Sequence, residues 1–165
     1  MTSASRSRFP GPRRQFWLES PAFADGATIP PRHTADGENV SVPLAWGNVP
    51  PACRQLVLLM EDPDAYTADP WVHWLLYGIS PSATSLPEAC PPDAYGARAG
   101  LNSWSGVGYR GPQPPPGSGL HRYRFRLLAV DADLDLASGL RRQQLLDAAA
   151  GHVIAEAALV GLYGR

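Results

Sequence analysis

The segment WVHWLLYGI, from Trp71 to Ile79, is apolar at both odd and even positions. A strand with one face in water alternates apolar and polar residues, whereas a strand covered on both faces has no need to alternate. We therefore predict that this segment is a central strand of a sheet. A chain with such a strand must fold with protein on both faces of that sheet.

Further elements follow from the apolar runs between turn-forming residues. The pattern predicts strands at 16–23, 42–46, 56–60 and 123–130, and a helix from about 140 to 150 that Ser138 caps and Gly151 ends. The tail 152–163 fits a helix by its alanines or a strand by its β-branched residues and Gly161, and we favour the strand. With 18 prolines and 16 glycines the chain suits short strands joined by shaped loops. The predicted fold is mainly β, a β-sandwich with one short helix and long loops.

Length and charge limit the classes of protein that need to be considered. The 165 residues fit one domain, which we place at 16–165 after a disordered lead-in at 1–15 that has no apolar signal-peptide core. A net charge of -1 gives no electrostatic argument for nucleic acid or an anionic membrane, and no apolar run is long enough to insert in one. Cys53 and Cys90 lack metal-ligand spacing. We expect a cytoplasmic protein without a cofactor.

Acidic residues follow the predicted strand 56–60. Asp62 has the same parity as Leu58 and Met60, so we expect its carboxylate to point toward the apolar side of the sheet. Asp64 repeats this parity after Pro63. An Asp-Pro-Asp sequence after a strand is often only a turn, and we expect Arg122 to hold a loop carbonyl or to pair with one of these aspartates.

Two histidines lie near the ends of other predicted strands. His121 shares parity with Tyr123 at the start of one strand, and His73 should share a face with Trp71, Leu75 and Tyr77. If the three strands are neighbours, Asp62, His73, His121 and Tyr123 surround one end of the sandwich.

These groups suit the binding of an anion. Two imidazoles and a phenol can donate hydrogen bonds to an anion's oxygens, and a carboxylate can orient an imidazole. We expect backbone N–H groups of Gly111, Gly117 and Gly119 to complete the site. The proline run between Gly111 and Gly117 would form a stiff wall, which limits the entropy lost on binding.

Five segments together resemble the phosphatidylethanolamine-binding protein family. They are DPDA after a strand, WVHW at the start of the next, GYRGPQPPPGSGLHRYRF, the earlier DGENVSVPLAW and the closing GHVIAEAALVGLYGR. The last two are similar to the bacterial branch, often labelled Raf-kinase-inhibitor-like. The resemblance implies a sandwich of two antiparallel sheets, a small anion pocket at one end and a regulatory role. Because bacterial members often pair, it also raises a homodimer as an expectation.

The resemblance also implies a set of binding residues. It assigns to the pocket Asp62, Asp64, His73, His121, Tyr123, Gly111, Pro114 and Pro115. The chain departs from the family at three positions: Tyr66 follows DPDA where a proline is usual, Gln113 stands where bacterial relatives often carry a cysteine, and Pro116 stands where a lysine is common in animal relatives. We expect Tyr66 and Gln113 to retune the site, and Trp71 to line it.

The leading hypothesis is a soluble binding protein, and not an enzyme, whose pocket takes the phosphate-like or carboxylate headgroup of a small ligand. An alternative is an enzyme in which Asp62 with His121 or His73 performs general acid–base chemistry, for instance a cyclisation or an isomerisation. The sequence offers no serine or cysteine with evident partners for nucleophilic catalysis, no metal-ligand cluster and no dinucleotide motif. A protein-interaction module with a vestigial pocket is a third alternative.

Overall fold

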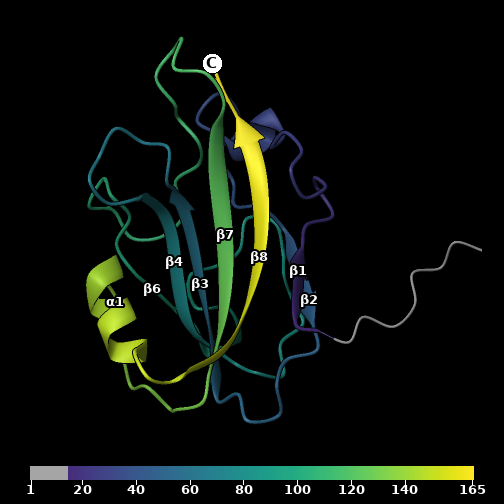
Figure 1. Ribbon diagram of the computed structural model, residues 1–165, viewed down its shortest axis with the longest axis vertical. Coiled ribbons are helices and arrows are strands. Elements are labelled where there is room, and N and C mark those ends of the chain that lie inside the picture. Colours follow the sequence, from purple (N-terminus) through teal and green to yellow (C-terminus); the bar gives the residue numbers. More distant parts are fainter. Residues whose placement is uncertain (1–14) are drawn as a thin grey trace, which may run out of the picture.

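The structure, a computed structural model, describes residues 15–165 and forms two antiparallel sheets (Figure 1). All but the last residue of the predicted lead-in 1–15 lies outside the described residues. The larger sheet has the order β6-β4-β3-β7-β8, and the smaller sheet has the order β1-β2-β5. The bounds of the larger sheet's strands are β3 Gln55–Asp62, β4 Trp71–Ile79, β6 Arg98–Ala99, β7 His121–Val130 and β8 Val153–Tyr163. Those of the smaller sheet are β1 Trp17–Glu19, β2 Leu44–Gly47 and β5 Ser85–Leu86.

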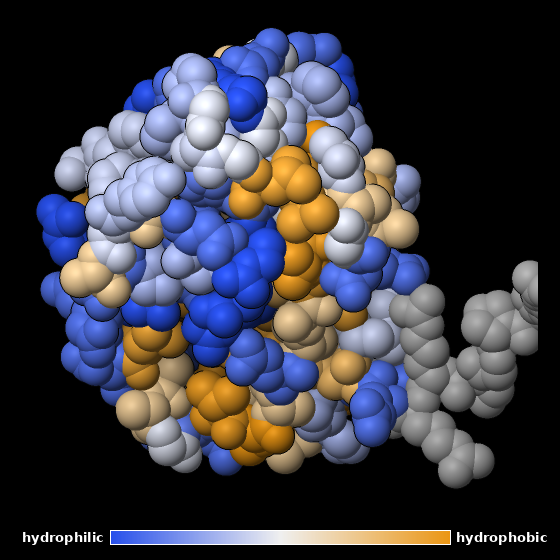
Figure 2. Space-filling model, turned by 45° about the horizontal axis from the view of Figure 1, so that its top comes forward, coloured by the Kyte–Doolittle hydropathy of each residue, from blue (hydrophilic) through white to orange (hydrophobic). Residues whose placement is uncertain are grey.

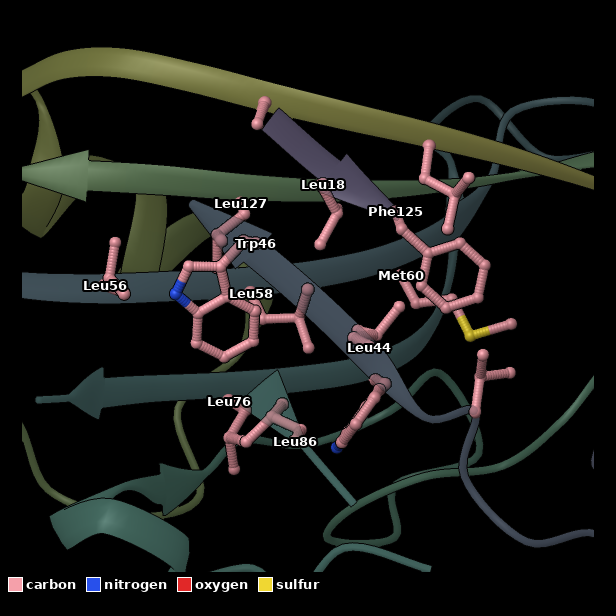
Figure 3. Packing of buried hydrophobic residues seen from close by; sticks show 14 of the residues in the cluster. Leu18, Leu44, Trp46, Leu56, Leu58, Met60, Leu76, Leu86, Phe125 and Leu127 are labelled. Atoms are coloured by element: carbon pink, nitrogen blue, oxygen red, sulfur yellow. The ribbon is translucent and has the colours of Figure 1, made fainter. Parts of the chain in front are cut away.

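The larger sheet is covered on both faces, which explains the apolar character of its central strands. One face packs on the smaller sheet through a core in which side chains of both sheets meet, among them Leu58, Phe125 and Trp46 (Figure 3). The other face packs on helix α1, Arg142–Ala149, through Leu145 and neighbouring apolar residues. Every residue of β3 is buried as a result. The predicted β-sandwich with one short helix and the predicted final strand are confirmed.

Two predicted element boundaries are wrong. The first strand is limited to Trp17–Glu19, because the Ser20 hydroxyl accepts the Ala22 N–H and donates to the Pro43 carbonyl, which turns the chain. Ser138 does not cap the helix. The cap is Arg141, whose N–H donates to Gln144 Oε1 at 2.9 Å.

The long segment between β4 and β7 carries short pieces of structure. These are β5, β6 and a 3-10 turn at Ala94–Gly96, and a second 3-10 turn, Pro31–His33, lies between β1 and β2. None of the helices among residues 15–165 is long and apolar enough to cross a membrane.

Candidate functional site: a cavity at one end of the sandwich

Strand order brings the predicted site residues to one end of the larger sheet, the upper end in Figure 1. In an antiparallel sheet the end of β3 meets the starts of its two neighbours, β4 and β7. Asp62 ends β3, His73 lies near the start of β4, and His121 and Tyr123 begin β7. A cavity of about 450 Å³ opens here, lined by Asp62, Ala65, Tyr66, Thr67, Trp71, His73, Trp104, Arg110, Gln113, Pro114, Pro115, His121, Tyr123 and Arg165.

A β-bulge places His73 in this cavity. Met60 pairs with Trp74 and Glu61 pairs with Val72, so that His73 has no partner on β3. Such an extra residue shifts the alternation of side chains by one position. The prediction that His73 shares a face with Leu75 and Tyr77 is therefore wrong, since those two residues face α1 while His73 lies against Tyr123.

His73 is neutral and offers an acceptor to the cavity. Its Nδ1 lies 2.6 Å from the Arg110 carbonyl oxygen, which can only accept, so Nδ1 carries the proton. Burial is the main cause that lowers the pKa of His73 to about 4. Nε2 therefore keeps a free lone pair near neutral pH. Nε2 has no hydrogen-bond partner among the described residues, and the protein does not enclose it completely. Because His73 lines the cavity, Nε2 is open to it.

Both ring nitrogens of His121 are occupied. Nδ1 lies 2.7 Å from Asp62 Oδ2, and Nε2 lies 2.9 Å from the Ser118 hydroxyl. Asp62 and His121 are almost fully buried, so water screens their pairing little. Asp62 orients the imidazole as expected. Neither nitrogen of His121, however, is free to donate to a ligand without first losing a partner.

Tyr123 is the donor at the base of the cavity. Its ring is buried between two imidazoles, edge-on to His73 at 5.2 Å and stacked on His121 at 6.4 Å. Burial first, and then the Asp62 carboxylate, raise the pKa of Tyr123 well above its usual value. The phenol thus keeps its proton, and its hydroxyl has no hydrogen-bond partner among residues 15–165.

Sequence reasoning missed five residues of the cavity, which are Ala65, Thr67, Trp104, Arg110 and Arg165. Trp104 packs edge-on against His73 and Trp71, and the Arg110 guanidinium lies over the Trp104 ring at 4.5 Å. Arg110 forms no ion pair with a carboxylate of the described chain, so its charge is uncompensated by direct contact. Arg165 is instead held by Asp36 at 2.6 Å. The signal for Arg110 was its place in GYRG, directly before the proline run; Trp104 lies in an irregular loop where nothing in the pattern fixes a direction.

Four of the residues predicted for the site do not line the cavity, which are Asp64, Gly111, Gly117 and Gly119. Asp64 forms an ion pair with Arg122 at 2.8 Å, one of the two roles expected for that arginine, and the Arg122 side chain is the largest cause that lowers the pKa of Asp64 to about 2. Gly111 packs its backbone against Thr34, and its N–H donates to Asn39 at 2.8 Å. The Gly117 N–H donates to the Arg165 backbone oxygen at 3.2 Å. These two amides are therefore not available to an anion as expected.

The rim and walls of the cavity are mixed in character. Tyr66 is 82% exposed, and Gln113 and Pro115 are exposed beside a buried Pro114. Figure 2, which brings this end forward, shows polar and apolar residues side by side. No group of three or more His, Cys, Asp or Glu side chains within the described range is placed to hold a metal ion.

Comparisons with known proteins agree with this architecture. The family model for phosphatidylethanolamine-binding protein matches residues 19–164. A UPF0098 protein of Methanothermobacter thermautotrophicus is 46% identical over 153 residues, which cover 90% of this chain and 98% of the relative.

Two crystal structures are similar to this chain over nearly their whole length. One is CT736 of Chlamydia trachomatis, described as a homolog of phosphatidylethanolamine-binding protein, with 36% identity, a TM-score of 0.86 and coverage of 93% of this chain and 99% of that one. The other is YbcL of E. coli, described as a member of the mammalian PEBP family, with 25% identity, a TM-score of 0.85 and coverage of 92% and 99%. This chain belongs to the phosphatidylethanolamine-binding protein family, in its bacterial, YbcL-type branch.

Proposed function

We propose that the protein binds the acidic head of a small ligand in the cavity at the end of the sandwich. The observation that carries this proposal is the pair of unused donors in one cavity, the Tyr123 hydroxyl and the Arg110 guanidinium. The Tyr123 ring is buried, but its hydroxyl is not enclosed by the protein, so it faces the cavity and is free to donate to a ligand. A guanidinium that is free of carboxylates and lines the same cavity favours an oxyanion as the ligand.

His73 limits which oxyanion fits. Its Nε2 can only accept, so the ligand must bring a donor to it. This revises the expectation that both imidazoles donate. A phosphate monoester or a free phosphate with one proton left meets both demands, since its P–OH donates to His73 and its other oxygens accept from Tyr123 and Arg110. Sulfate carries no proton near neutral pH and lacks the donor.

The remaining walls suit an organic group attached to the acid. The indoles of Trp71 and Trp104, the Pro114 ring and the exposed Tyr66 phenol surround the polar base. A volume of about 450 Å³ is in the range of small-molecule sites and exceeds what a single phosphate needs. Because the family is named for phosphatidylethanolamine, phosphoethanolamine is the first organic phosphate to test.

An amide NMR titration with inorganic phosphate and with phosphoethanolamine tests the proposal. We expect saturable shifts at the amides of His73, Arg110 and Tyr123, and a loss of affinity of about 10- to 100-fold in Tyr123→Phe, the cost of one hydrogen bond to a charged group. Tyr95→Phe is the matched control, because Tyr95 is exposed and does not line the cavity. Shifts that fail to saturate, or an unchanged affinity in Tyr123→Phe, would contradict the proposal.

We also propose a cytoplasmic location. It is supported by the two cysteines, Cys53 and Cys90, which are both free thiols, as is usual for proteins of a reducing compartment. Fractionation of cells that produce the full chain should recover it with cytoplasmic markers. Recovery with the membrane or an external fraction would overturn this assignment.

A further inference from the structure

Two side chains of one loop and strand end, Ser118 and His121, form a chain of hydrogen bonds with the distant Asp62 beside the cavity. The Ser118 hydroxyl lies 2.9 Å from His121 Nε2, and His121 Nδ1 lies 2.7 Å from Asp62 Oδ2. A nucleophile bonded to a base, and that base bonded to an orienting carboxylate, is the arrangement that activates serine in acyl transfer. The sequence could not reveal it, because 56 to 59 positions separate Asp62 from its two partners.

We propose that Ser118 is the nucleophile of an esterase-like acyl transfer, with His121 as general base and Asp62 as the residue that positions His121. The substrate class is an ester of a small carboxylic acid. The proposal is independent of acid binding, since it uses Ser118, His121 and Asp62, whereas the acid is held by Tyr123, Arg110 and His73.

Ser118 lies in a loop whose neighbouring residues Gly117 and Gly119 are exposed. Ser118 is half-buried, and it lies between Gly117 and Gly119, whose φ angles of 78° and 83° give the loop a turn that other residues rarely adopt. The Gly119 N–H donates to no acceptor among the described residues. An amide directly after a nucleophilic serine is one of the donors that stabilise the oxyanion in α/β-hydrolases.

The Ser118 hydroxyl has a second possible acceptor besides His121. Ser118 Oγ also lies 2.7 Å from the Pro115 carbonyl oxygen, so the hydrogen has two acceptors within reach. In attack, the hydrogen must turn from Pro115 to His121 Nε2. Pro115 and His121 line the cavity, whereas Ser118 itself does not, so the Ser118 oxygen lies behind these two residues and the acyl group must approach between them.

The reaction runs in two balanced steps. The Ser118 oxygen bonds to the ester carbonyl carbon while its proton passes to His121, the bond from carbon to the leaving alcohol breaks, and His121 returns the proton to that alcohol. Water then attacks the acyl-serine, gives a proton to His121 and releases the carboxylic acid, and the proton goes back to the Ser118 oxygen. Asp62 stays ionised and stabilises the imidazolium in both steps.

The test is covalent labelling of the full-length protein with a fluorophosphonate probe, followed by peptide mass spectrometry. We expect the adduct on Ser118, and a burst of about one equivalent of p-nitrophenol per chain with p-nitrophenyl acetate. Ser118→Ala should abolish both. His121→Gln should slow labelling by about 100-fold or more, the usual worth of a general base. Ser82→Ala is the matched control, because Ser82 is exposed and its hydroxyl bonds only the Ser80 hydroxyl.

The unmodified protein decides the question even if a variant fails to fold. An adduct confined to Ser118 supports the proposal. Labelling of no serine, while a known serine hydrolase in the same tube is labelled, overturns it, as does equal labelling of Ser82 and Ser118. Saturable phosphate binding without a Ser118 adduct would overturn the acyl transfer alone and leave the binding function intact.

Discussion

The Nδ1 atom of His73 lies 2.6 Å from the carbonyl oxygen of Arg110, in a pocket from which the imidazole is only 2% exposed. The carbonyl fixes the tautomer, and burial keeps the ring uncharged by lowering its pKa to about 4. We expect both the stability of the protein and the proposed choice of acid to depend on this contact.

The neutral His73 should make the protein less stable in mild acid. A histidine protonates near pH 6.5 in the unfolded chain and only near 4 in the folded one, so stability is complete above 6.5 and falls as the pH drops toward 4. We expect the free energy of unfolding in urea to fall by about 3 kcal/mol over this window. His73→Gln, which keeps a donor and an acceptor without a charge, should flatten the fall.

Carboxylates do not account for this window. Glu61 and Asp64 have lowered pKa values, so their contributions are lost only as the pH falls below their ordinary values of 4.5 and 3.8. An equal fall between pH 6.5 and 4.5 in wild type and His73→Gln would contradict the assignment.

Among the buried charged side chains, Glu61 should cost the most stability when its charge is removed. It is fully buried and pairs with Arg124, Arg126 and Arg142, the last of which ties helix α1 to the sheet. Glu61→Gln leaves these arginines without their shared carboxylate, and we expect a loss of about 3–5 kcal/mol in urea unfolding. Glu156→Gln is the control, because Glu156 is an exposed partner of Arg126 and should cost less than about 1 kcal/mol. Equal costs would show that the buried cluster stabilises nothing.

The two aspartates of the DPDA sequence should behave differently. Asp64 pairs with Arg122 in water, so Asp64→Asn should cost less than about 1 kcal/mol and leave phosphate affinity unchanged. Asp62 is buried against His121, and Asp62→Asn should cost about 3 kcal/mol or more. Urea unfolding and phosphate titration of both variants check this. If Asp64→Asn lowered the stability or the phosphate affinity more than Asp62→Asn does, Asp64 would belong to the site after all.

Gly111 should tolerate no side chain. A Cβ there would lie 2.2 Å from the His33 carbonyl oxygen and 2.6 Å from Asn39 Oδ1, so the loop that leads to Pro114 would have to move. We expect Gly111→Ala to lower the melting temperature and to weaken phosphate binding. Gly106→Ala, where the nearest atom lies at 3.4 Å, is the control and should change both little. An unaltered melting temperature in Gly111→Ala would show that the loop adapts.

The fold could be predicted from the sequence because its signals are local. The run from Trp71 to Ile79 is apolar on both parities since α1 and the smaller sheet cover its two faces, and the strand has the predicted bounds. The alternation from Tyr123 onward likewise separates the inner aromatic residues from arginines that reach Glu61. The predicted first strand extends too far, because the turn at Ser20 depends on a hydrogen bond to Pro43, which is distant in the sequence.

The cavity could be predicted only in part. Parity along single strands placed Asp62 and His121, but the bulge at His73 depends on pairing with β3, which no single segment encodes. Arg110 and Trp104 lie in loops whose direction is set by tertiary contacts. Ser118 lies within hydrogen-bond distance of His121 in a turn that contains Gly117 and Gly119, which both have positive φ angles. Backbone N–H groups were misassigned for the same reason, since their acceptors come from other loops.

Calorimetric titration of the protein with phosphate and with sulfate, at pH 6 and equal ionic strength, tests the central claim most directly. We predict saturable binding of phosphate and at least about 10-fold weaker binding of sulfate, because sulfate leaves His73 Nε2 unpaired at a cost of about 1–3 kcal/mol. Sulfate that binds as tightly as phosphate would contradict the role of His73 as an acceptor. The absence of binding by either anion would contradict the acid-binding cavity itself.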